Sequence, residues 1–177
     1  MLITRLKLKN WRNFRDIDVA LGPRAYLIGA NASGKSNFLD VFRFLRTIAQ
    51  SEGGGFQKAL KDRGGLSKLR SLHARKDPEV RIEIDVSESA SETDPPKWKY
   101  VLAFKSEGKG LQRVLIQEEA VYLAGKRIFA RPNSDDKKDA VRLTQTHLEQ
   151  INNNADFREL AEYFAATIYL HLVPQLL

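Results

Sequence analysis

Two short runs near the start of the chain alternate between apolar and polar residues. They cover residues 2–9 and 16–21. A period of two places successive side chains on opposite faces, which is typical of half-buried β-strands. Residues 25–28 are instead continuously apolar and follow a Gly-Pro turn, a pattern that favours a buried strand. The sequence therefore predicts a hairpin followed by a third, buried strand.

A helix is predicted directly after residue 36. Phe38, Val41, Leu45 and Ile48 recur three or four residues apart, with polar residues between them. This spacing places them on one face of an α-helix, which must pack against the rest of the protein.

Residues 79–131 return to a strand pattern. Residues 80–86 and 97–104 alternate, and shorter apolar runs follow at 114–116, 121–123 and 127–130, separated by turn-like stretches. We expect an antiparallel meander with one face exposed to solvent. Its acidic pair, Glu118 and Glu119, is predicted to lie at a solvated edge. The strand that ends at Asp85 alternates too strictly for a Walker B strand, which is buried and continuously apolar.

The remaining segments are less regular. Residues 51–78 form a basic connector broken by glycines, for which two interpretations stay open: a solvated linker, or a segment that contacts phosphate backbones. Residues 132–177 are predicted to contain a polar loop near 133–139, a helix over 156–164 and a β-prone return strand over 167–173.

Composition sets broad limits. The chain has 177 residues, of which 42% are apolar and 29% charged, as expected of about one soluble domain. It has no cysteine, no signal-peptide pattern and no apolar run near the roughly 18 residues of a membrane span. We therefore expect a cytoplasmic protein without disulfides and without a membrane partner.

Positive charge is concentrated in the first part of the chain. Residues 1–76 contain 16 Lys and Arg against 5 Asp and Glu, a net charge of +11, whereas residues 77–177 contain 13 against 17, a net charge of −4. A basic N-terminal part suits a bound nucleotide, DNA as a possible partner, or both. A solvated basic surface is the alternative.

Candidate chemistry lies between the third predicted strand and the helix. Residues 29–36 read GANASGKS and fit G-x-x-x-x-G-K-[ST], the phosphate-binding loop. Glycines let backbone N–H groups approach phosphate, and a helix start adds unpaired N–H groups. We predict that Lys35 reaches the β- and γ-phosphates of ATP and that the Ser36 hydroxyl holds Mg²⁺. The loop residues expected to bind the nucleotide are Asn31, Ala32, Ser33, Gly34, Lys35, Ser36 and Asn37. The alternative is a glycine-rich turn with a solvated lysine.

Residues 3–15 and 29–40 together resemble the N-terminus of RecF/SMC-like ABC-type ATPases, including those of the AAA_21 type. The similarity is strong over residues 1–50 and looser beyond. It implies an α/β fold, the N-terminal lobe of a P-loop NTPase with an antiparallel β-subdomain. In this family the first hairpin packs beside the nucleotide, so Arg12 and Asn13 are implied as nucleotide contacts. Trp11 stands where the family usually has Phe, and we predict that it packs in the core.

The resemblance also implies catalytic parts. A glutamine that ends a core strand contacts Mg²⁺ and the attacking water in many of these ATPases. Gln175, after the β-prone stretch, is the candidate for this catalytic and metal-binding role, and Gln117 is a weaker one.

Three further family elements are not visible in this sequence: an apolar strand ending in Asp-Glu, a signature segment of the L-S-G-G-Q kind and a switch histidine. We therefore expect residues 1–177 to form one incomplete ATPase head lobe. It would comprise the hairpin, phosphate loop and helix (1–50), the connector (51–78), the meander (79–131) and the final segment (132–177). Such a lobe would bind ATP and Mg²⁺ with little turnover, and it would act with a second head or a C-terminal lobe.

The resemblance implies a role in DNA maintenance, repair or defence. Two rivals remain at this point. One is a non-catalytic, nucleotide-gated module that binds DNA or serves as a scaffold. The other is a small-molecule kinase, which should show an arginine-rich lid where the meander lies.

Overall fold

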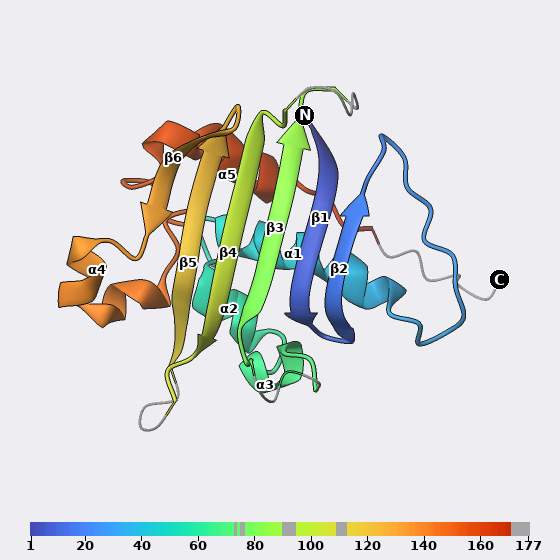
Figure 1. Cartoon of the computed structure of the whole chain (residues 1–177), viewed down its shortest axis with the longest axis horizontal. Helices are drawn as coiled ribbons and strands as arrows, with labels where there is room; N and C mark the ends of the chain where they lie inside the picture. The colour runs from blue at the N-terminus through green and yellow to red at the C-terminus, as the bar shows by residue number, and fades with distance from the viewer. Residues whose placement is uncertain (73, 75–76, 90–94, 109–112, 171–177) are drawn as a thin grey trace.

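The protein is built on one antiparallel sheet with helices on a single face (Figure 1). The computed structural model describes residues 1–72, 74, 77–89, 95–108 and 113–170. The strands are β1 (Leu2–Trp11), β2 (Phe14–Ala20), β3 (Val80–Ser87), β4 (Trp98–Ser106), β5 (Val114–Leu123) and β6 (Lys126–Arg131). They lie in the order β2-β1-β3-β4-β5-β6.

The hairpin and the meander predicted from sequence both form, and they join into one sheet. β1 pairs with β2 on one side and with β3 on the other, so that Leu8 is opposite both Ile17 and Ile82. Both pairings are antiparallel, which confirms the expected antiparallel sheet of an α/β fold.

The helices are short except for the first. They are α1 (Lys35–Ala49), α2 (Phe56–Lys61), α3 (Leu66–Leu69), α4 (Ser134–Lys138) and α5 (Arg158–Ala165), with 3-10 turns at Ala140–Thr144 and Ala155–Phe157. Figure 1 shows α1 and α5 crossing behind the sheet, α3 below its lower end and α4 beside β6. The predicted helix after residue 36 is thus confirmed.

The core lies between α1 and the inner face of the sheet. Trp11, at the end of β1, is fully buried. Its ring lies edge-on to Phe44 of α1, with 5.2 Å between ring centroids, and its indole N–H donates to the carbonyl of Asn37 at 2.8 Å. A buried indole usually needs such a partner, because an unpaired N–H costs free energy. The prediction that Trp11 packs in the core is confirmed.

The opposite face of the sheet is open in the part of the chain that the structure describes (Figure 1). Several of its basic side chains are paired with acidic side chains of the sheet. Arg81 binds Glu83 at 2.8 Å and Glu118 at 2.7 Å, and Lys99 binds Glu83 at 2.9 Å. Part of the charge on this face is therefore balanced within the protein.

A buried carboxylate connects α1 to two other segments. Asp40 accepts two hydrogen bonds from Arg63, each 2.9 Å long, and one of 3.1 Å from Arg12. Arg63 follows α2, and Arg12 lies in the turn between β1 and β2. Asp40 thus holds the start of α1 between the hairpin turn and the end of α2.

Residues 25–28 do not form the predicted strand. They pair with no other strand in the described residues, and Tyr26 and Ile28 are 81% and 92% exposed. A strand requires a neighbour for its backbone hydrogen bonds, and β2 forms the edge of this sheet with no further strand beside it. The expectation of a buried strand before the phosphate loop is wrong for this structure.

The last segment also differs from expectation. The predicted polar loop near residue 133 contains α4, because the Asn133 side chain accepts hydrogen bonds from the backbone N–H groups of Asp135 and Asp136. Asp136 returns a bond to the N–H of Asn133, which completes a capping box. The predicted helix over 156–164 corresponds to α5. No strand forms over residues 167–170, and the rest of the predicted return strand lies outside the described residues.

Glu119 is fully buried, which corrects its expected place at a solvated edge. It accepts hydrogen bonds from the Tyr100 hydroxyl at 3.0 Å and from the backbone N–H groups of His147 and Leu148 at 2.9 and 3.2 Å. Arg131 lies 3.6 Å away. This carboxyl group fastens the segment after the 3-10 turn at Ala140–Thr144 to the sheet. Burial raises the pKa of Glu119 to about 7, against the opposing effect of these bonds.

The pKa of His147, beside Glu119, is shifted in the opposite direction. Burial and the positive charge of Arg131 lower the pKa of His147 to about 4. Its ring lies against Phe129, with 4.8 Å between centroids, so the neutral imidazole fits this site.

We expect Asp40→Asn to lower the free energy of unfolding by about 3 kcal/mol, because it leaves two guanidinium groups without their shared carboxylate. Urea unfolding measures this loss. Asp62→Asn is the matched control: Asp62 pairs with Lys58 on the surface, and we expect a change below about 0.5 kcal/mol. Equal losses in the two variants would show that the Asp40 contacts do not stabilise the fold.

Glu119→Gln should change how stability depends on pH. The ordinary pKa of Glu119, 4.5, is raised on folding, so its contribution is complete below pH 4.5 and is lost as pH rises towards 7. The ordinary pKa of His147, 6.5, is lowered, so its contribution is complete above pH 6.5 and is lost as pH falls towards 4. The two trends oppose each other between these limits. Without Glu119, the unfolding free energy should rise more steeply from pH 4.5 to 7.

Urea unfolding at several pH values measures this slope. Glu118→Gln, on the open face, is the control and should leave the slope as it is. Parallel curves for the parent and Glu119→Gln would contradict the assignment.

Candidate functional site

The predicted phosphate loop lies between β2 and α1, at the right of Figure 1. It ends at Gly34, whose φ of +103° lies in the left-handed region that favours glycine. A Cβ at this position would also lie 2.9 Å from Oδ1 of Asn13. Gly34 is therefore required both for the turn into α1 and for the close approach of the hairpin turn.

The N-terminus of α1 is open to an anion. Gly34 offers no side chain to cap it, and its first turn contains no acidic residue. The first N–H groups of an α-helix have no partner inside the helix, and the helix dipole adds positive charge there. A helix of 15 residues that starts in this way after a glycine-rich loop has the properties of a phosphate-binding site.

Lys35 lies over the loop. Its ammonium group donates to the carbonyls of Gly29 and Ala30, at 2.6 and 2.7 Å. These partners are dipoles and not carboxylates, so the positive charge is not neutralised. The lysine is thus held beside the N–H groups at the helix start.

Asn13 connects the hairpin turn to the loop. Its side-chain amide donates to the carbonyl of Ser33 at 3.4 Å, and its oxygen accepts from the Asn37 side chain at 2.8 Å. The structure therefore brings together Asn13, Asn37 and the loop, and their contacts with a nucleotide stay a prediction. Ser36 is exposed at the start of α1, with its hydroxyl available to a ligand.

Arg12 is placed differently from its neighbour. Its guanidinium binds Asp40 at 3.1 Å and the carbonyl of Lys68 at 3.3 Å, and its backbone lies in the left-handed region at φ +52°. It is engaged with α1 and α3 and makes no hydrogen bond to the loop among the described residues. A nucleotide contact by Arg12 stays a prediction. Sequence reasoning did not find its partner Asp40.

The two candidate glutamines are not near this arrangement. Gln175 lies outside the described residues, so its proposed catalytic and metal-binding roles are untested. Gln117 lies on β5 and donates to the carbonyl of Leu115 at 3.4 Å.

The described part of the chain sets limits on other sites. No group of three His, Cys, Asp or Glu side chains there could hold a metal ion. Among those same residues, no helix has both the length and the apolar character needed to cross a membrane.

Sequence relatives are proteins described as DNA replication and repair protein RecF. The chain is 30% identical over 92 residues to the protein of Clavibacter michiganensis, an alignment that covers 51% of this chain and 23% of that protein. It is 41% identical over 61 residues to the protein of Brucella abortus, which covers 34% and 15%. The aligned part is thus about a quarter or less of the length of these relatives.

One solved structure, from a study of the ATP-driven dimerization and DNA-stimulated activation of SMC ATPases, aligns with a TM-score of 0.41 and 16% identity. It covers 92% of this chain and 98% of that one.

The chain also matches a protein family. The family described as "AAA domain, putative AbiEii toxin, Type IV TA system", AAA_21, matches residues 25–167. This range includes the phosphate loop, α1 and the whole meander. The resemblance to RecF/SMC-like ATPases of the AAA_21 type, stated from residues 3–15 and 29–40, is therefore confirmed, and the chain belongs to the AAA_21 family.

Proposed function

We propose that this chain binds ATP and Mg²⁺ at the loop of residues 29–36 and forms the N-terminal lobe of a RecF/SMC-like ATPase. The observation that carries this proposal is the open start of α1. It follows a left-handed glycine, lacks any capping or acidic side chain, and has the ammonium group of Lys35 held beside it. An anion with several negative oxygens suits this combination of N–H groups and positive charge.

Each residue then has a defined part. Backbone N–H groups of Asn31, Ala32, Ser33 and Gly34 contact the phosphates. Lys35 exchanges its two carbonyl partners for phosphate oxygens, which are stronger acceptors because they are charged. Asn13 and Asn37 hold the loop in position.

Mg²⁺ completes this site. The Ser36 hydroxyl holds the ion, which neutralises phosphate charge when bound. Hard oxygen donors of this kind are the ligands that Mg²⁺ prefers.

Hydrolysis needs a further group that positions or activates water. In the described part of the chain, the hydrogen bonds of the loop go to backbone carbonyls and amide side chains, and none goes to a carboxylate. We therefore propose that the chain alone binds ATP with little turnover, and that a second head or a C-terminal lobe supplies the missing group. The names of the RecF relatives support a role on DNA, in maintenance, repair or defence.

We expect Lys35→Ala to weaken ATP binding at least ~100-fold, because the variant loses a charge-assisted contact to the phosphates. Titration calorimetry with ATP and Mg²⁺ measures this. Lys126→Ala, at the β5–β6 turn, removes the same charge elsewhere and should bind ATP like the parent. ATP binding of equal strength by the parent and Lys35→Ala would overturn the proposed site.

The chain alone should hydrolyse ATP far more slowly than ~1 s⁻¹, a rate that is low among enzymes. Release of phosphate at saturating ATP and Mg²⁺ measures the rate, and Lys35→Ala provides the background. A turnover near ~1 s⁻¹ that Lys35→Ala abolishes would show that this chain contains its own water-activating group.

A further inference from the structure

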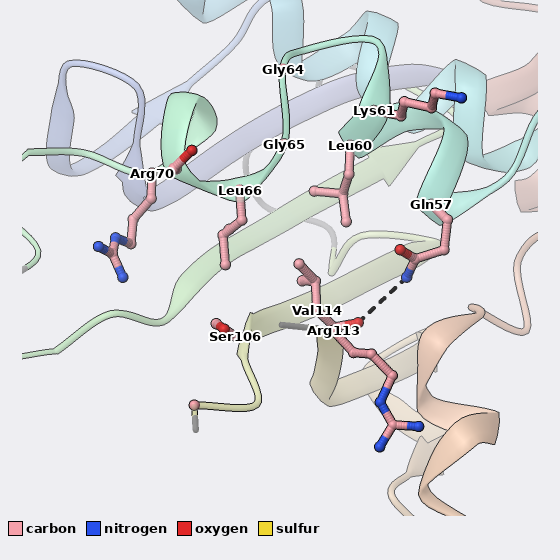
Figure 2. Close-up of a pocket in the computed structure, with 12 residues that line it drawn as sticks. Gln57, Leu60, Lys61, Gly64, Gly65, Leu66, Arg70, Ser106, Arg113 and Val114 are labelled. Carbon is pink, nitrogen blue, oxygen red and sulfur yellow. Dashed lines mark hydrogen bonds between the residues drawn. The ribbon is translucent and has the colours of Figure 1, made fainter. Parts of the chain in front are cut away.

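A second concave surface lies apart from the phosphate loop. α2, α3 and the ends of β4 and β5 enclose a pocket of about 1030 Å³, open to solvent, which we call the basic groove (Figure 2). Among the described residues, twelve line it, and none of these is acidic. They are Gln57, Leu60, Lys61, Gly64, Gly65, Leu66, Ser67, Arg70, Ser106, Gly108, Arg113 and Val114.

The shape of the basic groove follows from the turn between α2 and α3. Gly64 and Gly65 have φ of +77° and +84°, which glycine adopts without strain, and the N–H of Gly65 donates to the carbonyl of Leu60 at 2.9 Å. A Cβ at Gly65 would meet nothing within 4 Å, so the backbone faces open space there. Figure 2 shows Leu60 and Leu66 directed at Val114 in the middle, with Arg70 and Arg113 on either side and Lys61 at the rim, its ammonium group directed away from the middle.

The basic groove carries positive charge without acidic partners. Lys61 and Arg70 line it, and Lys68 lies beside them on α3; within the described residues none of the three has an ion pair. Arg113 is instead bound by Glu107 through two hydrogen bonds of 2.8 Å. Neighbouring positive charges without acidic partners repel one another, and binding of an anion removes this repulsion.

The open face of the sheet gives the comparison. There Arg81 and Lys99 are each bound to acidic residues of neighbouring strands. Acidic partners lower the net positive charge that these two cations present to a polyanion, whereas Lys61, Lys68 and Arg70 have no such partner among the described residues. The difference depends on which cations have partners and not on how many cations there are.

We propose that the basic groove binds the phosphate backbone of DNA. Its unpaired cations come from two successive helices, so an extended polyanion that follows the edge meets several of them, whereas a single carboxylate meets one. Phosphate contacts of this kind are independent of sequence and release bound counterions. The choice of DNA as the anion rests on the proposed function, in which this ATPase acts on DNA. The basic groove itself is separate from the nucleotide site.

The test removes two charges from the basic groove and two from a distant surface. The groove variant is Lys61→Gln with Arg70→Gln, and the control is Lys126→Gln with Arg127→Gln. The control residues are exposed on β6. They pair with the end of β5 that is farthest from Val114. Binding to a labelled duplex of about 30 base pairs is followed by fluorescence anisotropy from about 50 to 200 mM salt.

We expect the groove variant to bind DNA at least ~10-fold more weakly at low salt, and the slope of log K against log salt to fall by about 2. The control should stay within about 0.5 of the parent slope. Equal affinity and slope in the two double variants, or no DNA binding by the parent, would overturn the proposal.

A second variant guards against a folding defect. Ser67→Glu adds a negative charge at an exposed position of the basic groove, and we expect it to weaken DNA binding while its thermal unfolding matches that of the parent. Polyglutamate of matched charge is the competing probe. Polyglutamate that binds more tightly than DNA, and loses this affinity in the groove variant, would assign the surface to an acidic protein segment and overturn the choice of DNA.

ATP titration of the same variants separates this proposal from the proposed function. The groove variant should bind ATP like the parent, and Lys35→Ala should bind DNA like the parent. One outcome is that the parent binds DNA but no ATP and the groove variant loses DNA binding. This outcome would refute the nucleotide site and leave the DNA site standing. The other outcome is that the parent binds ATP and the groove variant binds DNA as tightly as the parent does. This outcome would refute the DNA site and leave the nucleotide site standing.

Discussion

The hydrogen bond from the indole of Trp11 to the carbonyl of Asn37 positions the start of α1. It joins the end of β1 to the first turn of the helix. The ring of Trp11 also packs against Phe44, further along α1. Asp40 adds ionic contacts to Arg12 and Arg63 within the same turn of helix. Because these contacts are made by the side of α1 that faces the sheet, its N-terminal N–H groups remain free for a ligand. The phosphate loop thus depends on a helix that is firmly held on one side and open at its end.

Local patterns predicted most of the fold for a physical reason. Alternation in β1, β2, β3 and β4 and the helical period in α1 record which face of each element is buried, and each of these elements forms. The apolar run at residues 25–28 also signals burial, but burial of a strand needs a neighbouring strand, and none lies beside it in this structure. A pattern of apolar residues reports that a surface must be covered and does not report what covers it.

The polar parts of the structure were harder to predict, because they depend on contacts between distant residues. Asp40 and Arg63 are 23 residues apart, and Glu119 and His147 are 28 apart. Nothing local to Glu119 distinguishes it from its half-buried neighbour Glu118, although the Glu119 carboxyl group is fully buried. The motif of residues 29–36 could be recognised in the sequence because it lies in consecutive residues. The position of Arg12 could not be predicted in this way, since it depends on where α1 presents Asp40.

The phosphate loop and the basic groove are connected through one short segment. Arg12 receives support from α3, because its N–H donates to the carbonyl of Leu69 at 2.7 Å, and Arg70 follows directly in the groove. Asn13, the next residue, contacts Ser33 in the loop. Coupling between two binding sites is reciprocal. A shift of this turn on nucleotide binding would change the affinity of the groove for an anion. An anion in the groove would then change the affinity of the loop for nucleotide by the same factor. Arg12 is the residue where such a shift would act, because its ionic bond to Asp40 and its bonds to α3 cannot all persist if its side chain turns towards the loop.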